Sequence, residues 1–278
     1  METMPCTPRR RRLAVRRSAA PGAVPGAVPV GVGTLHRIAR AAGSALRVAG
    51  LALGLMLPAA PALAGSPMLV ELFTSQGCSS CPPADETLSR LADREDIVAL
   101  SFHVDYWDYL GWRDTFADPV FTKRQFDYRD TWGERVVYTP QMVVGGDRPV
   151  VGSRRGEVEA ALADGRETGG QVTLKADGGP LMAAFSGVPG LAEIWVARFV
   201  QASTVEIERG ENRGRTITYR NVVRDLMRMG TVKQVGDGFA VPQPSPGEGV
   251  AVWAQAKDLG MVYAVGRYEI PVSTAAAN

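Results

Sequence analysis

The most reactive pairing in this 278-residue chain is Cys78 and Cys81, two thiols separated by two serines. An apolar run at 68–74 precedes them, and Pro82 opens a helical pattern directly after them. The first thiol therefore lies near a helix N-terminus, where unpaired backbone N–H groups and the helix dipole stabilise a thiolate. The second lies one turn further along, close enough to attack a mixed disulfide. The motif predicts thiol–disulfide exchange, with Cys78 as the attacking thiol and Cys81 as the resolving thiol.

Other interpretations of the cysteine pair remain open. A purely structural disulfide is the weaker one, because a bond that closes so short a loop restrains little chain entropy. A soft-metal site is stronger, because two thiolates and one imidazole suit Cu(I), and His103 is the one histidine after residue 64. We therefore keep a copper-binding protein that uses Cys78, Cys81 and His103 as the alternative function, together with a non-catalytic ligand-binding module. The leading interpretation needs no cofactor.

The elements around the cysteines follow an α/β pattern from 65 to 168. The expected order is β-α-β-α-β-β-α, with strands at 68–74, 97–104, 141–144 and 149–151 and with helices from Pro82, from Pro119 to about Thr131, and after a capping Ser153. The first two strands should be parallel, because a helix connects them. The Gly-Gly-Asp turn at 145–147 should close an antiparallel hairpin.

Residues 169–278 are expected to form a smaller β-rich domain, separated from the first by the glycine-rich stretch 164–170. Apolar runs between turn signals indicate strands at 172–176, 181–185, 194–200, 216–219, 250–254 and 262–268. One helix is expected at 221–229. The charged run Glu206–Arg215 alternates in sign and contains two glycines, which indicates a solvated hairpin.

An insertion at 105–138 is rich in aromatic residues, and its part 106–132 contains nine of the chain's twenty. Some of these rings must form a local core, because extra chain has to bury apolar surface to offset its ordering entropy. Trp107 and Trp112 fall at loop positions, where exposed aromatic residues serve as binding anchors, and we expect one of them to face a ligand groove. Asp105 and Asp108 fit the role of turn-forming residues.

The stretch VELFTSQGCSSCPP at 70–83 resembles the strand–loop–helix of thioredoxins. Thr139-Pro140 stands where that superfamily keeps a cis-proline beside its disulfide. The resemblance implies that the peptide bond before Pro140 is cis and that the backbone of Thr139 receives an extended substrate strand against Cys78. Glu71 lies one residue before the position of the buried acid that, in thioredoxins, carries the proton of the resolving cysteine. The resemblance therefore makes Glu71 a candidate proton shuttle.

Over 68–272 the chain is also similar to a family of secreted bacterial proteins known as domain of unknown function 1223. Its recurring stretches appear here as FHVDYWDYLGW at 102–112, YTPQMVV at 138–144 and RGENRGRTITYRNVVR at 209–224. This resemblance implies a thioredoxin-like fold and an exported location. It implies no activity, because one fold supports many functions.

Residues 1–64 have the composition of a leader. They contain nine arginines and one acidic residue, and they end in a short apolar run followed by Ala62-Leu63-Ala64. These are the parts of a secretory signal peptide, so we expect cleavage after Ala64, a periplasmic location and no stable membrane span. The remainder, with 22 basic and 28 acidic residues, has a net charge of −6, which does not favour nucleic acid. The expected partner is a thiol or disulfide on a protein or a small molecule.

Overall fold

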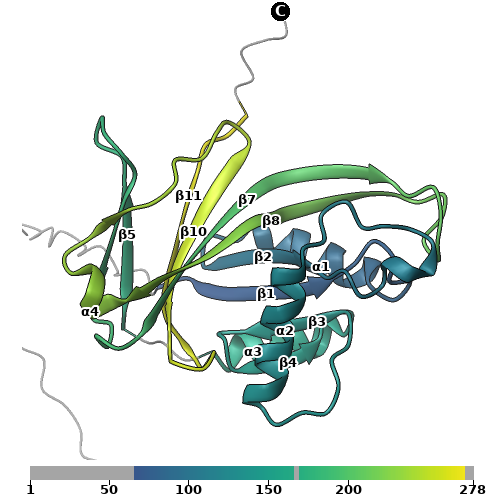
Figure 1. Ribbon diagram of the computed structural model, residues 1–278, viewed down its shortest axis with the longest axis horizontal. Helices are drawn as coiled ribbons and strands as arrows, with labels where there is room; N and C mark the ends of the chain where they lie inside the picture. The colour runs from purple at the N-terminus through teal and green to yellow at the C-terminus, as the bar shows by residue number, and fades with distance from the viewer. Residues whose placement is uncertain (1–65, 166–168, 273–278) are drawn as a thin grey trace, which may run out of the picture. The chain divides into compact units, whose positions relative to one another are not determined.

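The computed structural model describes residues 66–165 and 169–272. The predicted signal peptide at 1–64 lies outside these residues. Of the helices within them, none is long and apolar enough to cross a membrane. The fold is mixed α/β, with eight strands in one large sheet and three in a small one among the described residues (Figure 1). The strand order of the large sheet is β11-β10-β7-β8-β2-β1-β3-β4.

The first half of the described chain has the predicted element order. Its elements are β1 (Met68–Thr74), α1 (Pro82–Ala92), β2 (Ile97–His103), the short 3-10 helix η1 (Asp108–Leu110), α2 (Pro119–Thr131), β3 (Gln141–Val144), β4 (Arg148–Val151) and α3 (Arg155–Ala163). The parallel pairing of β1 with β2 and the antiparallel hairpin of β3 and β4 are both confirmed. The expected cap Ser153 is wrong: α3 begins one residue later, so Arg154 takes the capping position and makes no side-chain capping bond.

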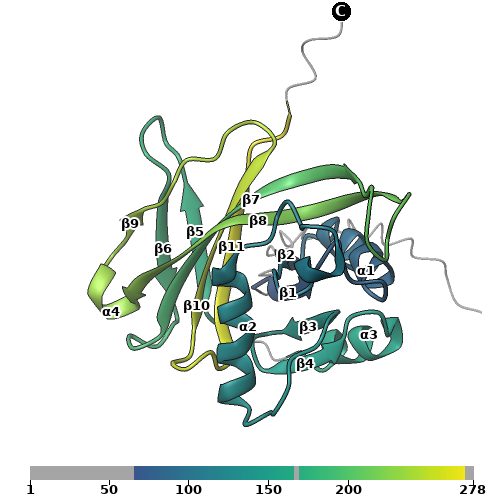
Figure 2. The same ribbon diagram turned by 45° about the vertical axis from the view of Figure 1, so that its right-hand side comes forward.

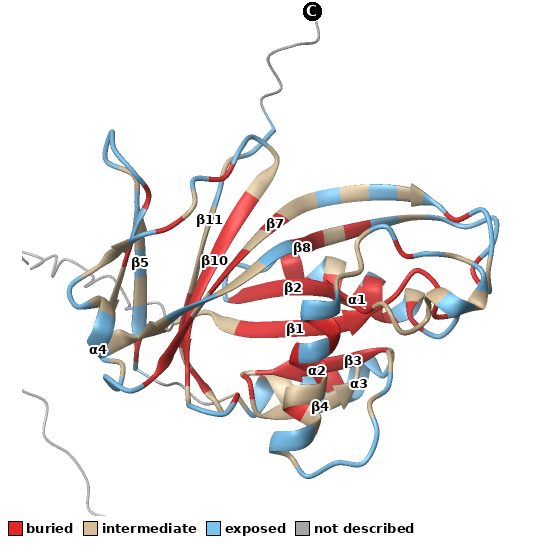
Figure 3. Cartoon of the chain, in the orientation of Figure 1, coloured by how far each residue is buried: buried red, intermediate tan, exposed pale blue. Residues whose placement is uncertain are grey.

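The helices cover the two faces of this part of the sheet. Adjacent side chains of a strand point to opposite faces. Accordingly, Leu72 of β1 packs in a cluster with Leu88 of α1 and Val158 of α3. The next residue, Phe73, packs in a second cluster with Phe121 of α2. Figure 2 shows α1 and α3 on one side of β1 and β3, with α2 on the other. Figure 3 shows that β1 and β2 are almost wholly buried between these layers.

The longer strands of the second half extend the same sheet. They are β7 (Glu193–Glu206), β8 (Thr216–Thr231), β10 (Glu248–Gln255) and β11 (Val262–Glu269). β8 joins β2 in parallel through the pair Ser101 and Val222. The small sheet consists of β5 (Gln171–Lys175), β6 (Met182–Ser186) and β9 (Phe239–Ala240), and the short helix α4 (Val232–Val235) follows β8. Strands from both sides of residue 168 therefore share the large sheet.

The helix expected at 221–229 is wrong, because β8 runs through the whole segment. The pairing of β7 with β8 shifts register twice, which leaves Arg224 and Met229 as extra residues on β8. Each β-bulge interrupts the alternation of buried and exposed side chains. The apolar residues of β8 therefore fall at spacings that imitate one face of a helix.

Candidate functional site

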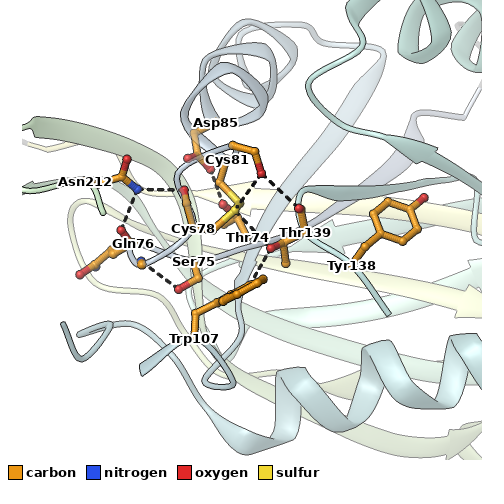
Figure 4. Close-up of a disulfide and its surroundings, with 12 residues drawn as sticks. Thr74, Ser75, Gln76, Cys78, Cys81, Asp85, Trp107, Tyr138, Thr139 and Asn212 are labelled. Carbon is orange, nitrogen blue, oxygen red and sulfur yellow. Dashed lines mark hydrogen bonds between the residues drawn. A yellow bond between two sulfur atoms is a disulfide. The ribbon is translucent and has the colours of Figure 1, made fainter. Parts of the chain in front are cut away.

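Cys78 and Cys81 form a disulfide at the junction of β1 and α1 (Figure 4). Cys81 occupies the capping position of α1, and Pro82 begins the helix. Cys78 keeps 3% of its accessible surface and Cys81 keeps none. Cys78, the predicted attacking thiol, is therefore slightly more exposed than Cys81.

Thr139 contacts the disulfide directly. Its hydroxyl donates a hydrogen bond to Cys78 Sγ at 3.2 Å, and it accepts one from Trp107 Nε1 at 2.7 Å. The Thr139–Pro140 peptide bond is cis, as expected. Trp107, Thr139 and Cys78 therefore form a continuous hydrogen-bonded chain (Figure 4). The side-chain contact from Thr139 is an addition to the backbone role expected from the sequence.

Trp112 approaches the same loop from another direction. Its Nε1 donates to Gln76 Oε1 at 2.8 Å, and the backbone N–H of Gln76 donates to Asp114 at 2.7 Å. Both Trp107 and Trp112 are partly buried. The structure therefore brings both tryptophans to the disulfide loop, with each indole committed to a hydrogen bond there.

Asp85 is a buried acid that the sequence argument missed. It lies one turn after Cys81 on α1, and its Oδ1 accepts a hydrogen bond from the hydroxyl of Thr74 at 2.8 Å. Its Oδ2 has no hydrogen-bond partner among the described residues. Burial raises the pKa of Asp85 to about 7, although the charge of His103 and the Thr74 hydrogen bond act to lower it. The sequence contains one indication that Asp85 is buried: it is three residues before Leu88, which places it on the apolar face of the helix.

Glu71, the acid expected at the cysteines, is not brought to them. It is two residues before Phe73 on β1 and therefore faces α2, away from α1. Its carboxylate is fully buried and pairs with Arg124, with Glu71 Oε1 at 2.6 Å from Arg124 Nε. Tyr128 donates to the same carboxylate. Glu71 is thus a member of a buried ion-pair network on the opposite face of the sheet.

His103 is fully buried at the end of β2. Its Nδ1 lies 2.7 Å from Asp114 Oδ2, and its ring packs edge-on against Tyr219. Burial acts to raise the pKa of Asp114, but the charge of His103 and hydrogen bonds from His103 and from backbone N–H groups lower it below its ordinary value. Within 66–165 and 169–272, no group of three or more His, Cys, Asp or Glu side chains is placed to bind a metal ion. The geometry therefore does not unite His103 with the two cysteines.

Asp105 and Asp108 make local contacts. Asp105 Oδ1 accepts from the hydroxyl of Thr122 at 2.6 Å, and Asp108 Oδ1 accepts from the backbone N–H of Asp114 at 3.0 Å. Both bonds organise the loop that follows β2, which agrees with the turn-forming role expected of these residues.

Asn212 is a second site residue that the sequence argument missed. The run 206–215 does form a hairpin turn between β7 and β8, as predicted, but Asn212 is buried rather than solvated. Its Nδ2 donates to the carbonyl oxygens of Gln76 and Cys78 at 2.9 and 2.8 Å (Figure 4). Gly210, with φ +75°, lets the turn approach closely, since a Cβ there would lie 3.1 Å from Cβ of Trp112. The hairpin thus clamps the disulfide loop.

We expect Asn212→Ala to destabilise the protein by about 1–3 kcal/mol, because it removes the side-chain donor from the carbonyl of Gln76 and one of the two donors to the carbonyl of Cys78, which keeps the N–H of Cys81. Urea unfolding of the oxidised protein measures this change. Glu211→Ala, at the exposed neighbouring position, is the matched control and should alter the free energy of unfolding by less than about 0.5 kcal/mol. Equal effects of the two substitutions would contradict the clamp.

These features define a mixed α/β protein with a disulfide at a strand–helix junction, held against a cis-proline segment. The chain belongs to the family described as "Protein of unknown function (DUF1223)", which matches residues 69–255.

Two solved structures are similar to this chain. One is the crystal structure of an Agrobacterium tumefaciens protein from a structural genomics consortium, with a TM-score of 0.62 and 29% identity over 77% of this chain and 98% of that one. The other is HBP35 of Porphyromonas gingivalis, with a TM-score of 0.45 and 13% identity over 77% of this chain and 79% of that one. No curated protein matches the sequence significantly.

Proposed function

We propose that this protein is an exported thiol–disulfide oxidoreductase whose first half has a thioredoxin-like fold. The observation that carries the proposal is the hydrogen bond from the Thr139 hydroxyl, beside the cis peptide bond, to Cys78 Sγ of the Cys78–Cys81 disulfide. The order of β1 to α3, with parallel β1 and β2 and an antiparallel β3–β4 hairpin, supports the fold assignment.

In the first step, the thiolate of reduced Cys78 attacks one sulfur of a partner disulfide. A bond forms between Cys78 Sγ and that sulfur, and the other partner sulfur leaves as a thiolate. The hydroxyl of Thr139 stabilises the attacking thiolate by donating a hydrogen bond to it. Trp107 holds that hydroxyl in place through its indole N–H.

In the second step, the thiolate of Cys81 attacks Cys78 Sγ and releases the partner's second thiolate. The Cys78–Cys81 disulfide forms, and two electrons pass from the protein to the partner. Cys81 must first lose its proton in a buried environment. Asp85 is the acceptor in this proposal, because it is buried one turn away and its pKa of about 7 suits proton exchange near neutral pH. The reverse sequence oxidises a partner dithiol.

Exposed aromatic residues beside the disulfide suit a protein partner. Tyr109 is 77% exposed and stacks on Trp107, and Tyr138, next to Thr139, is 36% exposed. Tyrosines of this kind are frequent binding anchors in protein interfaces. An extended partner segment that lies along Tyr138 and Thr139 would bring its disulfide to Cys78.

Export is part of the proposal and rests on the composition of residues 1–64. N-terminal sequencing of protein recovered from a bacterial periplasm should give Gly65 or a residue within a few positions of it. Recovery of the full chain from the cytosol alone would refute export.

A copper site is not proposed, because the described geometry brings no third ligand to the two cysteines.

Thr139→Val tests the role of the hydroxyl. It removes the donor to Cys78 while keeping the volume, so we expect the pKa of the Cys78 thiol to rise by about one unit, the equivalent of one hydrogen bond to a charged sulfur. Exchange with a model disulfide at pH 7 should slow by no more than about tenfold, because the thiolate fraction falls while the remaining thiolate becomes a stronger nucleophile. The pH dependence of alkylation by iodoacetamide measures the pKa.

Thr139→Ser keeps the hydroxyl and is the matched control, which should retain the parent pKa. A parent protein that shows no exchange above buffer, or a Val variant with the parent's pKa, would count against the proposed function.

A further inference from the structure

A cavity of about 470 Å³ lies between α2 and the strands of the second half of the chain, apart from the disulfide. Its volume is in the range of small-molecule sites. Arg124 and Trp195 line it, together with the apolar side chains of Leu226 and Leu259. The charged residues at its mouth are largely paired, as in the ion pair between Lys123 and Asp127.

Arg124 directs two of its three guanidinium nitrogens to partners, while its third nitrogen, Nη1, makes no hydrogen bond to any described residue. Its Nε and Nη2 donate to the Glu71 carboxylate, and Nη2 also donates to Gln255. The side chain is 2% exposed, and Nη1 has no hydrogen-bond partner within the part of the chain that the structure describes. A buried donor left unpaired costs free energy, so such a group marks a place where an acceptor binds.

Trp195 supplies a second donor of the same kind. Arg124 Cζ lies 4.7 Å from the centre of a Trp195 ring, and Trp195 Nε1 is buried without a hydrogen-bond partner in 66–165 or 169–272. Two unpaired N–H donors thus belong to adjacent side chains in the wall of one cavity. An oxygen with two lone pairs is able to accept from both.

The charges around the cavity favour a neutral ligand. Glu71 compensates the charge of Arg124, and Glu193, which lines the cavity, pairs with Arg228. Asp130 pairs with Arg129, and Asp258, an exposed acid that also lines the cavity, disfavours an anionic ligand. We propose that the cavity binds a small neutral molecule that carries a carbonyl oxygen on an aromatic or apolar body, with the oxygen between Arg124 Nη1 and Trp195 Nε1.

Benzamide is a suitable probe, because it joins a carbonyl to an aromatic ring. In ¹⁵N–¹H spectra of the oxidised protein, benzamide should shift the indole N–H signal of Trp195, with a Kd on the order of 1 mM for a ligand of this size. Protonated benzylamine has the same ring but offers only donors, and it should leave that signal in place. Crystals soaked in benzamide should show its oxygen at both donors.

Two variants make the test specific to the cavity. Trp195→Phe removes one donor, and Leu226→Trp fills the space, so both should weaken benzamide binding at least about tenfold in ligand-detected titrations. Trp132→Phe, which does not line the cavity, should bind like the parent. Stronger binding of benzylamine, a parent Kd above about 20 mM, equal binding by all variants, or a soaked crystal with only water between the donors would each overturn the proposal.

Discussion

Cys78→Ser is expected to lower the rate of exchange with a disulfide substrate at least about 1000-fold, because it removes the thiolate that attacks the partner. Cys81→Ser should behave differently, since Cys78 can still attack but nothing resolves the product. A covalent partner adduct on Cys78 should therefore accumulate in stoichiometric amount. Mass spectrometry before and after reduction, together with the turnover rate, distinguishes the two outcomes.

The control is Ser79→Ala, which keeps both thiols and removes an exposed hydroxyl between them. It should exchange at a rate within a few-fold of the parent. If both cysteine variants turned over the substrate like the parent, the oxidoreductase proposal would be wrong. If the reduced parent bound copper or zinc in stoichiometric amount and His103→Ala lost it, the metal-binding alternative would replace it.

Asp85→Asn should remove a large pH dependence of stability. The carboxyl has a pKa of about 7 in the folded state, against 3.8 for an ordinary Asp. Below pH about 4 it is neutral in both states. Between about 4 and 7 the unfolded chain releases the proton while the folded protein keeps it, so the free energy of unfolding falls as pH rises. The full loss, reached above pH 7, is roughly 4 kcal/mol at about 1.4 kcal/mol per pKa unit.

Urea unfolding of the oxidised protein from pH 4 to 8 measures this slope, which Asp85→Asn should lack. Glu86→Gln, at the exposed neighbouring acid, is the matched control and should keep the slope. In the reduced protein, Asp85→Asn should also slow resolution of the mixed disulfide by about 100-fold if the carboxyl accepts the Cys81 proton. An unchanged slope would show that Asp85 ionises normally in the folded state.

The elements next to the disulfide were predictable because their signals are local. Pro82 lies in the first turn of α1, and Asp118 caps α2 just before Pro119, so both helices begin where the sequence indicates. Thr139 and Pro140 were placed beside the cysteines by resemblance. These features depend on a few neighbouring residues, and tertiary context changes them little.

Some residues were misplaced or missed because their contacts are not set locally. Those contacts depend on which face of the sheet the side chain is on, or on a segment far away in the sequence. Glu71 and Thr74 are three positions apart on β1 and therefore face opposite sides of the sheet. Thr74 accordingly forms a hydrogen bond with Asp85, whereas Glu71 forms one with Arg124. That parity was visible in the sequence. The burial of Asn212 was not, because it follows from strand pairing over more than a hundred residues.

The clamp on the disulfide loop also sets an order of events during synthesis. Asn212 lies 134 residues after the Cys78 carbonyl that it binds. At about 5–20 residues per second, roughly 7 to 27 s separate the appearance of the two groups. During that interval the loop has no donor from the hairpin. The chain after residue 64 contains no third cysteine, so once the predicted leader with Cys6 is removed the pair has no competing intramolecular thiol during that interval.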